Sequence, residues 1–226
     1  LKVLTEFVEK CILIIHNKWY NCGKEKEKIR KMGLKESNEI TVKVKCELEE
    51  LYKILEEYGF KALHKFSMDD YYFIPESLNL NQMSVREILA KAVLVRDILG
   101  KTSGEISKKI TVKIKNFDEQ GNILSQKSVN CDIASIEDAK NLLKAIGYKE
   151  IMNIKEEDIV YEKDSFELSI KNVINGDNLI EVETDDKYNT IEKLIEKINE
   201  INIPIYTDNY FVKKAEVELE KILTNI

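Results

Sequence analysis

Glu39-Ile-Thr-Val-Lys-Val-Lys45 alternates polar and apolar residues along its whole length. Side chains two positions apart share one face of an extended strand. The polar residues of this segment are therefore expected on one face: Glu39, Thr41, Lys43 and Lys45. Near the other end of the chain, Ile180-Glu-Val-Glu183 alternates in the same way, so its two glutamates should project together. A face that carries carboxylates beside ammonium groups suits a metal ion and a polyanion.

Composition limits the class of protein. The chain has 226 residues, 34% of them charged, and a net charge of -6. This length suits one large domain, or one domain with an appendage. Residues 1–31 contain eight Lys or Arg and four Glu, a net charge of +4, which leaves -10 on residues 32–226. An acidic body does not attract a nucleic acid backbone, so we expect no nucleic acid partner.

Neither a membrane span nor a disulfide framework is indicated. The apolar run 11–15 is far shorter than the ~20 residues that cross a bilayer, and no small-residue cleavage site follows it. The four cysteines lack metal-site spacing, and free thiols are typical of a reducing cytosol. We therefore expect a cytoplasmic protein without a membrane partner.

Residues 1–38 differ from the rest of the chain and are expected to be an N-terminal extension. They contain the single tryptophan, Trp19, and the basic run Lys24–Lys31. Met32 precedes a polar lead into the first strand, which leaves two interpretations open. Residues 1–31 are either translated upstream sequence that is not native, or an ordinary N-terminal helix with a basic tail. Residues 39–226 are expected to form a single domain that ends in a helix.

The body contains an internal repeat. Glu49–Lys61 aligns without gaps on Glu137–Lys149. Each copy predicts an amphipathic helix that ends at a glycine, Gly59 or Gly147, in the left-handed conformation. The apolar faces are expected to comprise Leu48, Leu51, Tyr52 and Leu55 in one copy, and Ala139, Leu142, Leu143 and Ile146 in the other. A strand on either side of each helix predicts a strand-helix-strand unit used twice, and hence a pseudo-twofold sheet.

Between and after the two copies the pattern is mostly that of strands. The expected strands are Asp69–Pro75, Leu89–Ile98, Ile106–Phe117, Ile123–Ile133, Ile159–Ile170 and Leu179–Thr184. The segment 118–122 is a turn that should make a hairpin. Two helices follow, one opened by the polar residues at 189–190 and one that runs from beyond Pro204 to about Leu223. The total is about eight strands and four helices, mostly antiparallel.

Amphipathic helices need an apolar sheet face to cover, while several strands carry paired charges on their other face. Each charged face taken alone is explained as well by contact with water. The arrangement that satisfies all of them is an α+β fold, with a closed antiparallel eight-stranded β-barrel, helices packed on the outside and charges inside. Closure also removes the sheet edges.

This arrangement resembles the CYTH superfamily, the triphosphate tunnel fold of class IV adenylate cyclases, thiamine triphosphatases and inorganic triphosphatases. The matching segments are Glu39–Lys43 for an E-x-E-x-K strand, Asp70–Phe73 for D-x-Y-F, Val93–Arg96 for R-x-R, Ile110–Lys115 for a lysine strand and Leu179–Glu183 for a closing E-x-E. The resemblance covers residues 39–210, and it implies that the barrel forms a tunnel for a triphosphate.

Four positions depart from the family's pattern. Thr41 replaces the second glutamate of the opening strand, and Leu94 replaces the first arginine of R-x-R. Asp158 belongs to an acidic run where the family has a basic cluster, and Lys171 stands where an aspartate is expected. These exchanges favour a protein that has lost the standard active site.

The resemblance also implies roles for particular residues. A divalent metal, Mg²⁺ or Mn²⁺, would be held by Glu39, Glu181 and Glu183, because these ions prefer carboxylate oxygens. The triphosphate would be bound by the cations of the tunnel: Lys43, Lys45, Arg96, Lys113 and Lys115. No catalytic base can be identified.

Two functions stay open. The first is a divergent CYTH-like enzyme that hydrolyses or cyclises an organic or nucleoside triphosphate. The second is a catalytically lapsed tunnel-fold module that binds a phosphorylated ligand or a partner without turnover. A small-molecule triphosphate is the expected partner. A homodimer is compatible with the sequence, which does not decide the oligomeric state.

Overall fold

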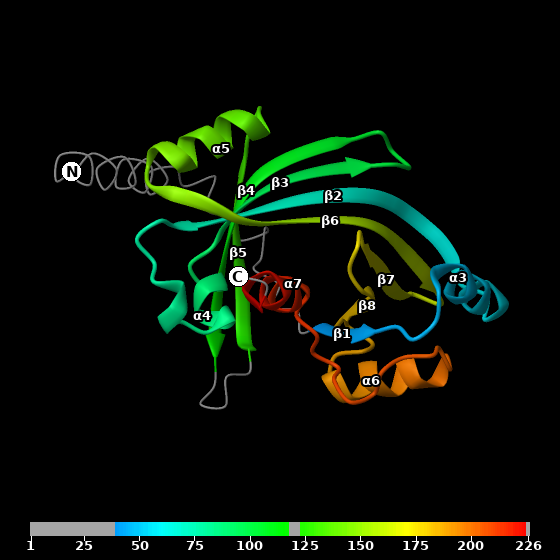
Figure 1. The fold of residues 1–226 in the computed structure, drawn as a ribbon. Helices are drawn as coiled ribbons and strands as arrows, with labels where there is room; N and C mark the ends of the chain where they lie inside the picture. The colour runs from blue at the N-terminus through cyan, green and yellow to red at the C-terminus, as the bar shows by residue number, and fades with distance from the viewer. Residues whose placement is uncertain (1–38, 118–122, 225–226) are drawn as a thin grey trace, which may run out of the picture. The chain divides into compact units, whose positions relative to one another are not determined.

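The computed structural model describes residues 39–117 and 123–224 (Figure 1). In these ranges eight strands form one antiparallel sheet in the order β1-β8-β7-β6-β2-β3-β4-β5. The strands are β1 (Glu39–Lys43), β2 (Lys61–Pro75), β3 (Val93–Gly100), β4 (Ile106–Phe117), β5 (Ile123–Asp132), β6 (Tyr148–Lys163), β7 (Phe166–Val173) and β8 (Asn178–Glu183). The predicted α+β class is confirmed. The extension over residues 1–38 and the turn at 118–122 lie outside the described residues, and the domain boundary at residue 39 stays a prediction.

Helices accompany the sheet in the described ranges. They are α3 (Leu48–Glu57), the 3-10 helix η1 (Leu80–Gln82), α4 (Val85–Leu89), α5 (Ile136–Ala145), α6 (Ile191–Glu200) and α7 (Lys214–Thr224). The longest of these, α7, has 11 residues. None of the helices in the described part of the chain has the length and apolar character that crossing a membrane requires.

Three helices cover one face of the sheet, here called the outer face. Leu51 of α3 and Leu194 of α6 are buried in one cluster with Ile40 of β1. Leu143 of α5 packs in a second cluster with Phe73 of β2. Burying a side chain of this kind contributes about 1.5–3 kcal/mol, so these contacts hold the amphipathic helices where the periodicity predicts them.

The opposite face, here called the charged face, carries the polar residues of β1 and β8, as the alternation predicts. Two further helices lie on this same face. Ile88 of α4 and Leu219 of α7 are buried with Tyr72, Leu94 and Ile154, and Figure 1 shows β2 and β6 arching past α7. The prediction that the helices pack on the outside is therefore wrong for α7, and α4, which the sequence did not predict, lies on the same face. The middle of the charged face is apolar, and an apolar strand face has to be covered.

The two ends of the sheet, β1 and β5, are not joined by a ladder in the described ranges, so the closed eight-stranded barrel is not confirmed. The segment 204–212 occupies the free edge of β1 instead. The Thr41 amide donates to the Tyr210 carbonyl (2.9 Å), and the Val212 amide donates to the Thr41 carbonyl (3.0 Å). These bonds satisfy edge groups of β1 that a closed barrel would pair with β5.

The predicted single strand Ile159–Ile170 is wrong. Asp164 and Ser165 have φ angles of 51° and 67°, and they form the turn between β6 and β7. Two consecutive left-handed residues are what a tight two-residue hairpin turn requires. β6 and β7 therefore pair with each other over this segment.

The predicted strand Leu89–Ile98 begins later, at Val93. Ser84 forms a capping box with Glu87, and this cap supports α4 through Leu89. The β-branched run that suggested a strand therefore starts only after the helix has ended.

Both copies of the repeat form ten-residue helices, α3 and α5. Gly59 and Gly147 follow these helices with φ angles of 84° and 87°, a conformation that costs a residue with a Cβ roughly 1–2 kcal/mol. Ser135 caps α5 by accepting a hydrogen bond from the Asp138 amide (3.2 Å). The predicted helices and their glycine ends are confirmed.

The predicted apolar face of α5 is too wide. Ala139 and Leu143 are buried, but Leu142 and Ile146 are 57% and 43% exposed. Successive residues of a helix are about 100° apart, and α5 meets the sheet along a stripe centred on Ala139 and Leu143. Leu142 therefore lies on the flank of the contact, and Ile146 comes after the helix has ended.

Candidate functional site

The three carboxylates predicted to hold a metal lie together on the charged face. Glu39 of β1 is directly opposite Glu183 of β8, and Glu181 is opposite Thr41. One carboxylate oxygen of each glutamate lies within 4.8 Å of those of the other two. Hard oxygen donors at this spacing suit Mg²⁺ or Mn²⁺, so the donor set fits an ion of the predicted kind. Metal binding itself stays a prediction. We call Glu39, Glu181 and Glu183 the carboxylate cluster.

Two ammonium groups contact the carboxylate cluster. Lys213 Nζ lies 3.7 Å from Glu39 Oε1, and Lys171 Nζ lies 3.2 Å from Glu181 Oε1. Neighbouring carboxylates disfavour one another's ionisation unless a positive charge is close. The lysines therefore reduce the repulsion within the cluster.

Arg96 of β3 is bound to a buried carboxylate. Its Nε and Nη2 each donate a 2.7 Å hydrogen bond, one to each carboxylate oxygen of Asp70 on β2. Asp70 is completely buried. Burial alone would raise the pKa of Asp70, but the bonds and charge of Arg96 outweigh burial and hold this pKa below its usual value. A phosphate that binds Arg96 would have to share it with Asp70.

Lys113 of β4 lies near this pair. Its charge is among those that lower the pKa of Asp70, so the structure brings together Lys113 and Arg96, two of the predicted phosphate ligands. The backbone of Lys115 pairs with Gln126 in the β4–β5 ladder, but its side chain lies outside the described residues.

Lys43 and Lys45, the predicted phosphate ligands of the first strand, have other partners. Lys43 Nζ lies 2.6 Å from Asp177 Oδ1. Lys45 follows the end of β1, and its Nζ lies 4.9 Å from the centre of the Tyr206 ring. Phosphate binding by the predicted cations stays a prediction.

Two of the four departures from the family pattern, Leu94 and Thr41, are uncharged residues, and both are buried. Leu94, where an arginine is expected, is 3% exposed and lies in the apolar cluster beneath α4 and α7. Thr41, where a glutamate is expected, is 4% exposed. Neither Leu94 nor Thr41 therefore presents its side chain to solvent in this structure.

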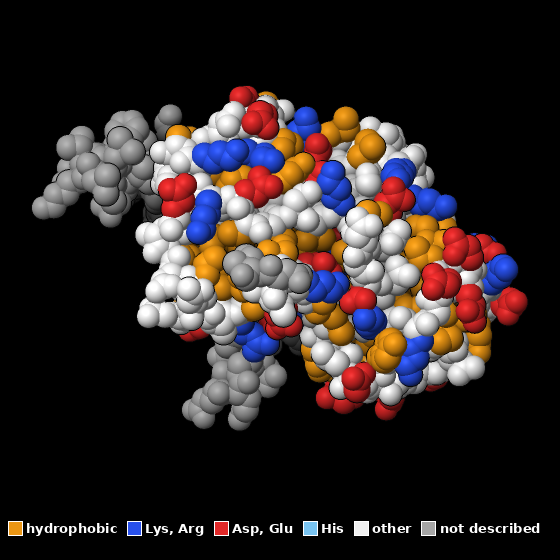
Figure 2. Space-filling model, viewed as in Figure 1, with side chains coloured by type: hydrophobic (Ala, Val, Ile, Leu, Met, Phe, Trp, Pro, Cys, Tyr) orange, Lys and Arg blue, Asp and Glu red, His pale blue; other side chains and the backbone are white. Residues whose placement is uncertain are grey.

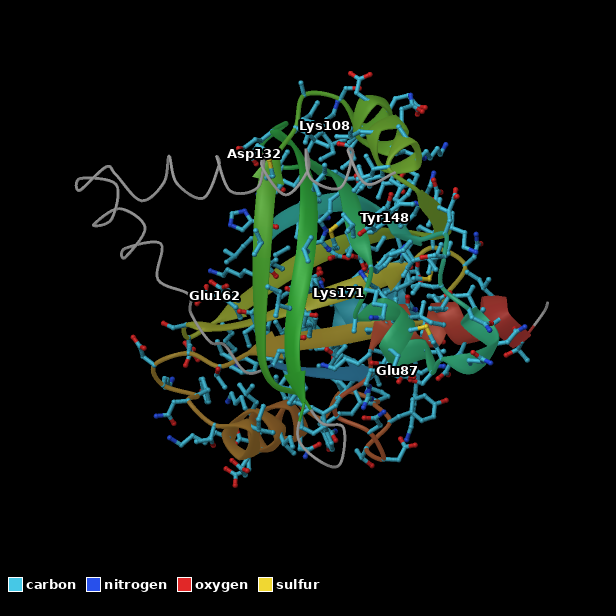
Figure 3. The ribbon with its side chains drawn as sticks, turned by 90° about the vertical axis from the view of Figure 1, so that its left-hand side faces the viewer. Glu87, Lys108, Asp132, Tyr148, Glu162 and Lys171 are labelled. Carbon is cyan, nitrogen blue, oxygen red and sulfur yellow. The ribbon has the colours of Figure 1, made fainter. Side chains whose placement is uncertain are left out.

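The other two departures, Asp158 and Lys171, are cross-strand partners. They lie opposite one another on β6 and β7, and Lys171 Nζ is 3.3 Å from Asp158 Oδ2. At each of these two positions the charge is opposite to the one that the resemblance implies, and in this chain the two residues form an ion pair. The exchange places the positive charge next to Glu181 of the carboxylate cluster, and Lys171 lies near the middle of the view in Figure 3.

Sequence analysis missed Glu156, Lys213 and Lys214. Glu156 of β6 is 1% exposed, and Lys214 Nζ donates to its Oε1 at 2.6 Å. Alternation would have placed Glu156 on the same face as Asp158. Lys213 precedes α7 and Lys214 is its first residue, and nothing in the sequence pattern indicates that α7 packs on the charged face.

The pKa of Asp158 predicts how stability depends on pH. Burial raises this pKa to about 7, opposed by Lys171 and Lys214 and reinforced by Glu156. The unfolded value is about 3.9, so between pH 4 and 7 the folded state keeps a proton that the unfolded state releases. The free energy of unfolding should therefore fall as pH rises through this window, by at most about 1.4 kcal/mol per pH unit.

Urea unfolding of the wild type and of Asp158→Asn at pH 5, 6, 7 and 8 measures this effect. Asparagine does not titrate, so the slope between pH 5 and 7 should flatten in the variant. An equal slope in the two proteins would assign the pH dependence to another group.

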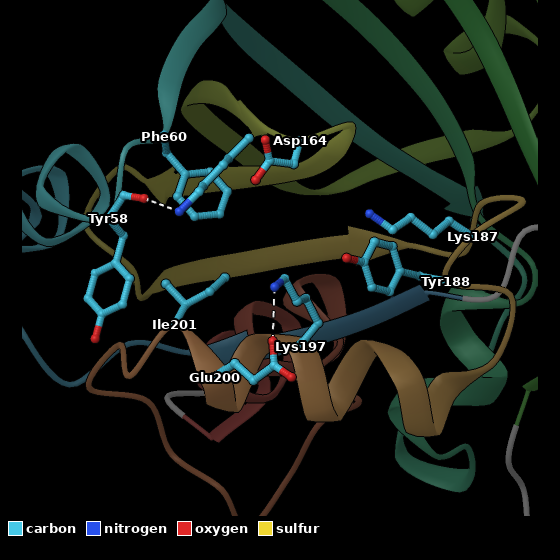
Figure 4. A pocket seen from close by; sticks show the side chains of 9 residues that line it. Tyr58, Phe60, Asp164, Lys187, Tyr188, Lys197, Glu200 and Ile201 are labelled. Atoms are coloured by element: carbon cyan, nitrogen blue, oxygen red, sulfur yellow. Dashed lines mark hydrogen bonds and ion pairs between the residues drawn. The ribbon is translucent and has the colours of Figure 1, made fainter.

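A pocket of about 210 Å³ lies away from the predicted site residues (Figure 4). Its lining includes Tyr58 and Phe60 after α3, Lys197 and Glu200 of α6, and Lys163 at the end of β6. None of its nine lining residues belongs to the predicted metal or phosphate ligands. Acidic and basic side chains are intermixed over the face of the molecule seen in Figure 2, and the pocket lining likewise carries both signs, with Asp164 and Glu200 beside three lysines.

No protein-family model matches the sequence, and no curated protein matches it. Solved structures do match. The PH1819 protein from Pyrococcus horikoshii OT3 has a TM-score of 0.60 at 17% identity, over 82% of this chain and 99% of that chain. A conserved hypothetical protein from Pyrococcus furiosus has a TM-score of 0.52 at 18% identity, over 76% of this chain and 98% of that chain. A candidate adenylate cyclase from Vibrio parahaemolyticus has a TM-score of 0.52 at 15% identity, over 84% of this chain and 98% of that chain.

Likenesses at this level of identity concern the fold, and each of them covers nearly all of the matching chain. A shared fold does not fix a shared reaction. The chain therefore has the fold of these proteins, and the resemblance to the CYTH superfamily is confirmed as a likeness of fold.

Proposed function

We propose that this protein acts on an organic or nucleoside triphosphate, by hydrolysis or cyclisation, at its charged face. The observation that carries the proposal is the carboxylate cluster, whose three oxygens converge within 4.8 Å on the face that also holds Arg96 and Lys113. Carboxylates for a metal beside cations for phosphates are what phosphoryl and nucleotidyl transfer require. The likeness to a candidate adenylate cyclase is consistent with it.

Glu39, Glu181 and Glu183 would hold Mg²⁺ or Mn²⁺. When bound, such an ion neutralises charge that develops on the phosphate oxygens and leaving group. The glutamates themselves supply hard oxygen donors from two adjacent strands, so their spacing is set by the β1–β8 ladder.

The cations of the charged face would bind the phosphate oxygens. Arg96 is the strongest candidate, because its bidentate bond to Asp70 fixes the guanidinium plane. The other proposed ligands are Lys43, Lys45, Lys113 and Lys115.

Two reactions are compatible with such a site. In hydrolysis, a water oxygen bonds to the terminal phosphorus while the bridging P–O bond breaks, and the water proton leaves to solvent. In cyclisation, the ribose 3′ oxygen bonds to the α-phosphorus while the bond from that phosphorus to the bridging oxygen breaks, pyrophosphate departs and the hydroxyl proton leaves to solvent. Both need positioning and charge neutralisation more than covalent help from the protein.

We also propose that a tunnel encloses this site. The β1 side of the wall would be completed by the segment 204–212, which is bonded to the edge of β1, and by α7. Exclusion of water from such a tunnel would strengthen the contacts to the phosphates.

A second function, binding without turnover, is favoured by a specific observation. Two of the proposed phosphate ligands are already held by carboxylates, Arg96 by Asp70 and Lys43 by Asp177. In addition, Leu94 is buried where the resemblance implies an arginine. With fewer available cations, the site has less positive charge with which to stabilise a transition state.

Phosphate and pyrophosphate release from ATP, thiamine triphosphate and tripolyphosphate, each with Mg²⁺ or Mn²⁺, separates these functions. Release above the uncatalysed rate supports the enzyme, and the product distinguishes hydrolysis from cyclisation. Thermal unfolding with the same ligands is measured in parallel. A rise in Tm without product supports binding without turnover. If no polyanion raises the Tm and none is converted to product, both functions are contradicted.

A further inference from the structure

Lys171 has an unusual place on the charged face. Its side chain is only 12% exposed, and its ammonium group lies between Asp158 on β6 (3.3 Å) and Glu181 on β8 (3.2 Å). The strand that carries it, β7, runs between those two strands in the sheet. The ammonium group therefore bridges two carboxylates from the neighbouring strands.

Two buried carboxylate groups near Lys171 each have one oxygen that no hydrogen bond from the described part of the chain reaches. Glu156 and Asp158 are each 1% exposed. One oxygen of each, Glu156 Oε2 and Asp158 Oδ1, has no hydrogen-bond partner among the described residues. Buried carboxylate oxygens without a partner are costly. Lys214 contacts Glu156 (2.6 Å), whereas Lys171 contacts Asp158 and Glu181, so without the charge of Lys171 these two carboxylates would need another cation.

We propose that Lys171 is an internal cation that fills a second divalent-ion position between Asp158 and Glu181, so that the charged face holds one divalent ion and not two. The ion is held by the carboxylate cluster, and Lys171 neutralises the carboxylates beside it. This inference rests on the proposed function, because it concerns the same site, but its test does not depend on turnover.

The proposal makes the length and charge of residue 171 decisive. Lys171→Ala removes the ammonium group and vacates the volume of the side chain, which leaves Asp158 and Glu181 without their shared cation and available to a divalent ion. Lys171→Arg keeps the positive charge and serves as the matched control.

Mn²⁺ binding is measured by the loss of the electron paramagnetic resonance signal of the free ion, and by calorimetry. We expect one Mn²⁺ per chain for the wild type and for Lys171→Arg, and two for Lys171→Ala. A second pair of proteins removes the first site through Glu39→Gln with Glu183→Gln. In that background we expect no bound ion with Lys171 present and one ion with Lys171→Ala.

The outcomes separate this inference from the proposed function. If the wild type binds no ion and Lys171→Ala binds one, the proposed metal site fails and the internal cation stands. If folded Lys171→Ala binds no more ions than the wild type, the internal cation is overturned, whatever the wild type binds. Two ions on the wild type also overturn it.

Folding is monitored by circular dichroism with and without Mn²⁺. A Lys171→Ala protein that folds only with Mn²⁺ supports the proposal, because an ion that binds the folded state stabilises it. Lys171→Gln, which keeps a hydrogen-bond donor without the charge, gives a second variant with the same expected stoichiometry. If both neutral variants stay unfolded with Mn²⁺ present, the ion does not replace the ammonium group and the proposal is wrong.

Discussion

Replacing Arg96 with methionine is expected to lower the free energy of unfolding by about 3–5 kcal/mol, because it leaves a buried carboxylate without its partner. Arg96 donates both of its short bonds to Asp70, and Asp70 has no exposed surface. Methionine fills much of the arginine's volume, so the loss reports on charge and hydrogen bonding more than on packing. Urea unfolding at pH 7.5 measures it.

The pH dependence of this loss tests its cause. In the wild type the pKa of Asp70 is lowered, so its stabilising contribution is present above the unfolded pKa of about 3.9 and is lost as pH falls through the folded value. In Arg96→Met, burial dominates and this pKa rises instead. The variant's carboxyl then takes up a proton in mild acid, so the difference from the wild type should be smaller at pH 4.5 than at pH 7.5.

Arg86 provides the matched control. It also forms an ion pair, with Glu216 at 3.2 Å, but its side chain is 43% exposed. Exposed pairs contribute roughly 0–1 kcal/mol, so Arg86→Met should cost far less than Arg96→Met. Adding Asp70→Asn to Arg96→Met should recover part of the loss. Equal losses at positions 86 and 96, or a loss independent of pH, would contradict the buried-charge explanation.

The sequence predicted which face of each strand carries the glutamates of the carboxylate cluster, but not that the two strands lie side by side. Alternation puts Glu181 and Glu183 on one face of β8 and Glu39 on one face of β1. Antiparallel pairing of the two strands then brings the three together. Short-range periodicity thus gives the orientation of the glutamates on each strand, whereas their predicted metal role came from the resemblance and the pairing of β1 with β8 from the structure.

The pairing of Asp158 with Lys171 needed one more piece of information. Its register follows directly from the turn at Asp164 and Ser165. That turn contains neither glycine nor the Asn-Gly signal of a two-residue hairpin. The sequence pattern therefore reads as one continuous strand, and the two departures look unrelated.

The position of the C-terminal region could not be predicted. The apolar stripe of α7 specifies that Leu219 is buried, but not against which face of the sheet. The bonds from segment 204–212 to β1 are made by backbone groups, which leave no trace in side-chain periodicity. Side-chain periodicity therefore predicts neither the free edge of the sheet at β1 nor the contact between Lys213 and Glu39.

Neutralising two members of the carboxylate cluster should abolish both the rise in Tm with Mn²⁺ and metal-dependent triphosphate turnover. The metal-free variant should be at least as stable as the metal-free wild type. The cluster places three carboxylates within 4.8 Å, and like charges at this range repel. Glu39→Gln combined with Glu183→Gln removes two charges while keeping the side-chain shapes. Without metal, the Tm of this double variant should therefore equal or exceed that of the wild type.

With Mn²⁺ the wild type should have the higher Tm of the two proteins, because only the wild type gains stability from binding the ion. Triphosphate turnover in the double variant should fall by at least about 100-fold, the usual effect of removing one group that stabilises a transition state. Glu49→Gln on α3, which packs on the outer face, makes the same chemical change away from the site and should leave both measurements unchanged. A double variant that loses stability without metal would show that the cluster supports the fold through contacts such as that of Lys213. A double variant that keeps its response to Mn²⁺ would place the metal elsewhere, and the proposed reaction at this face would then lose its basis.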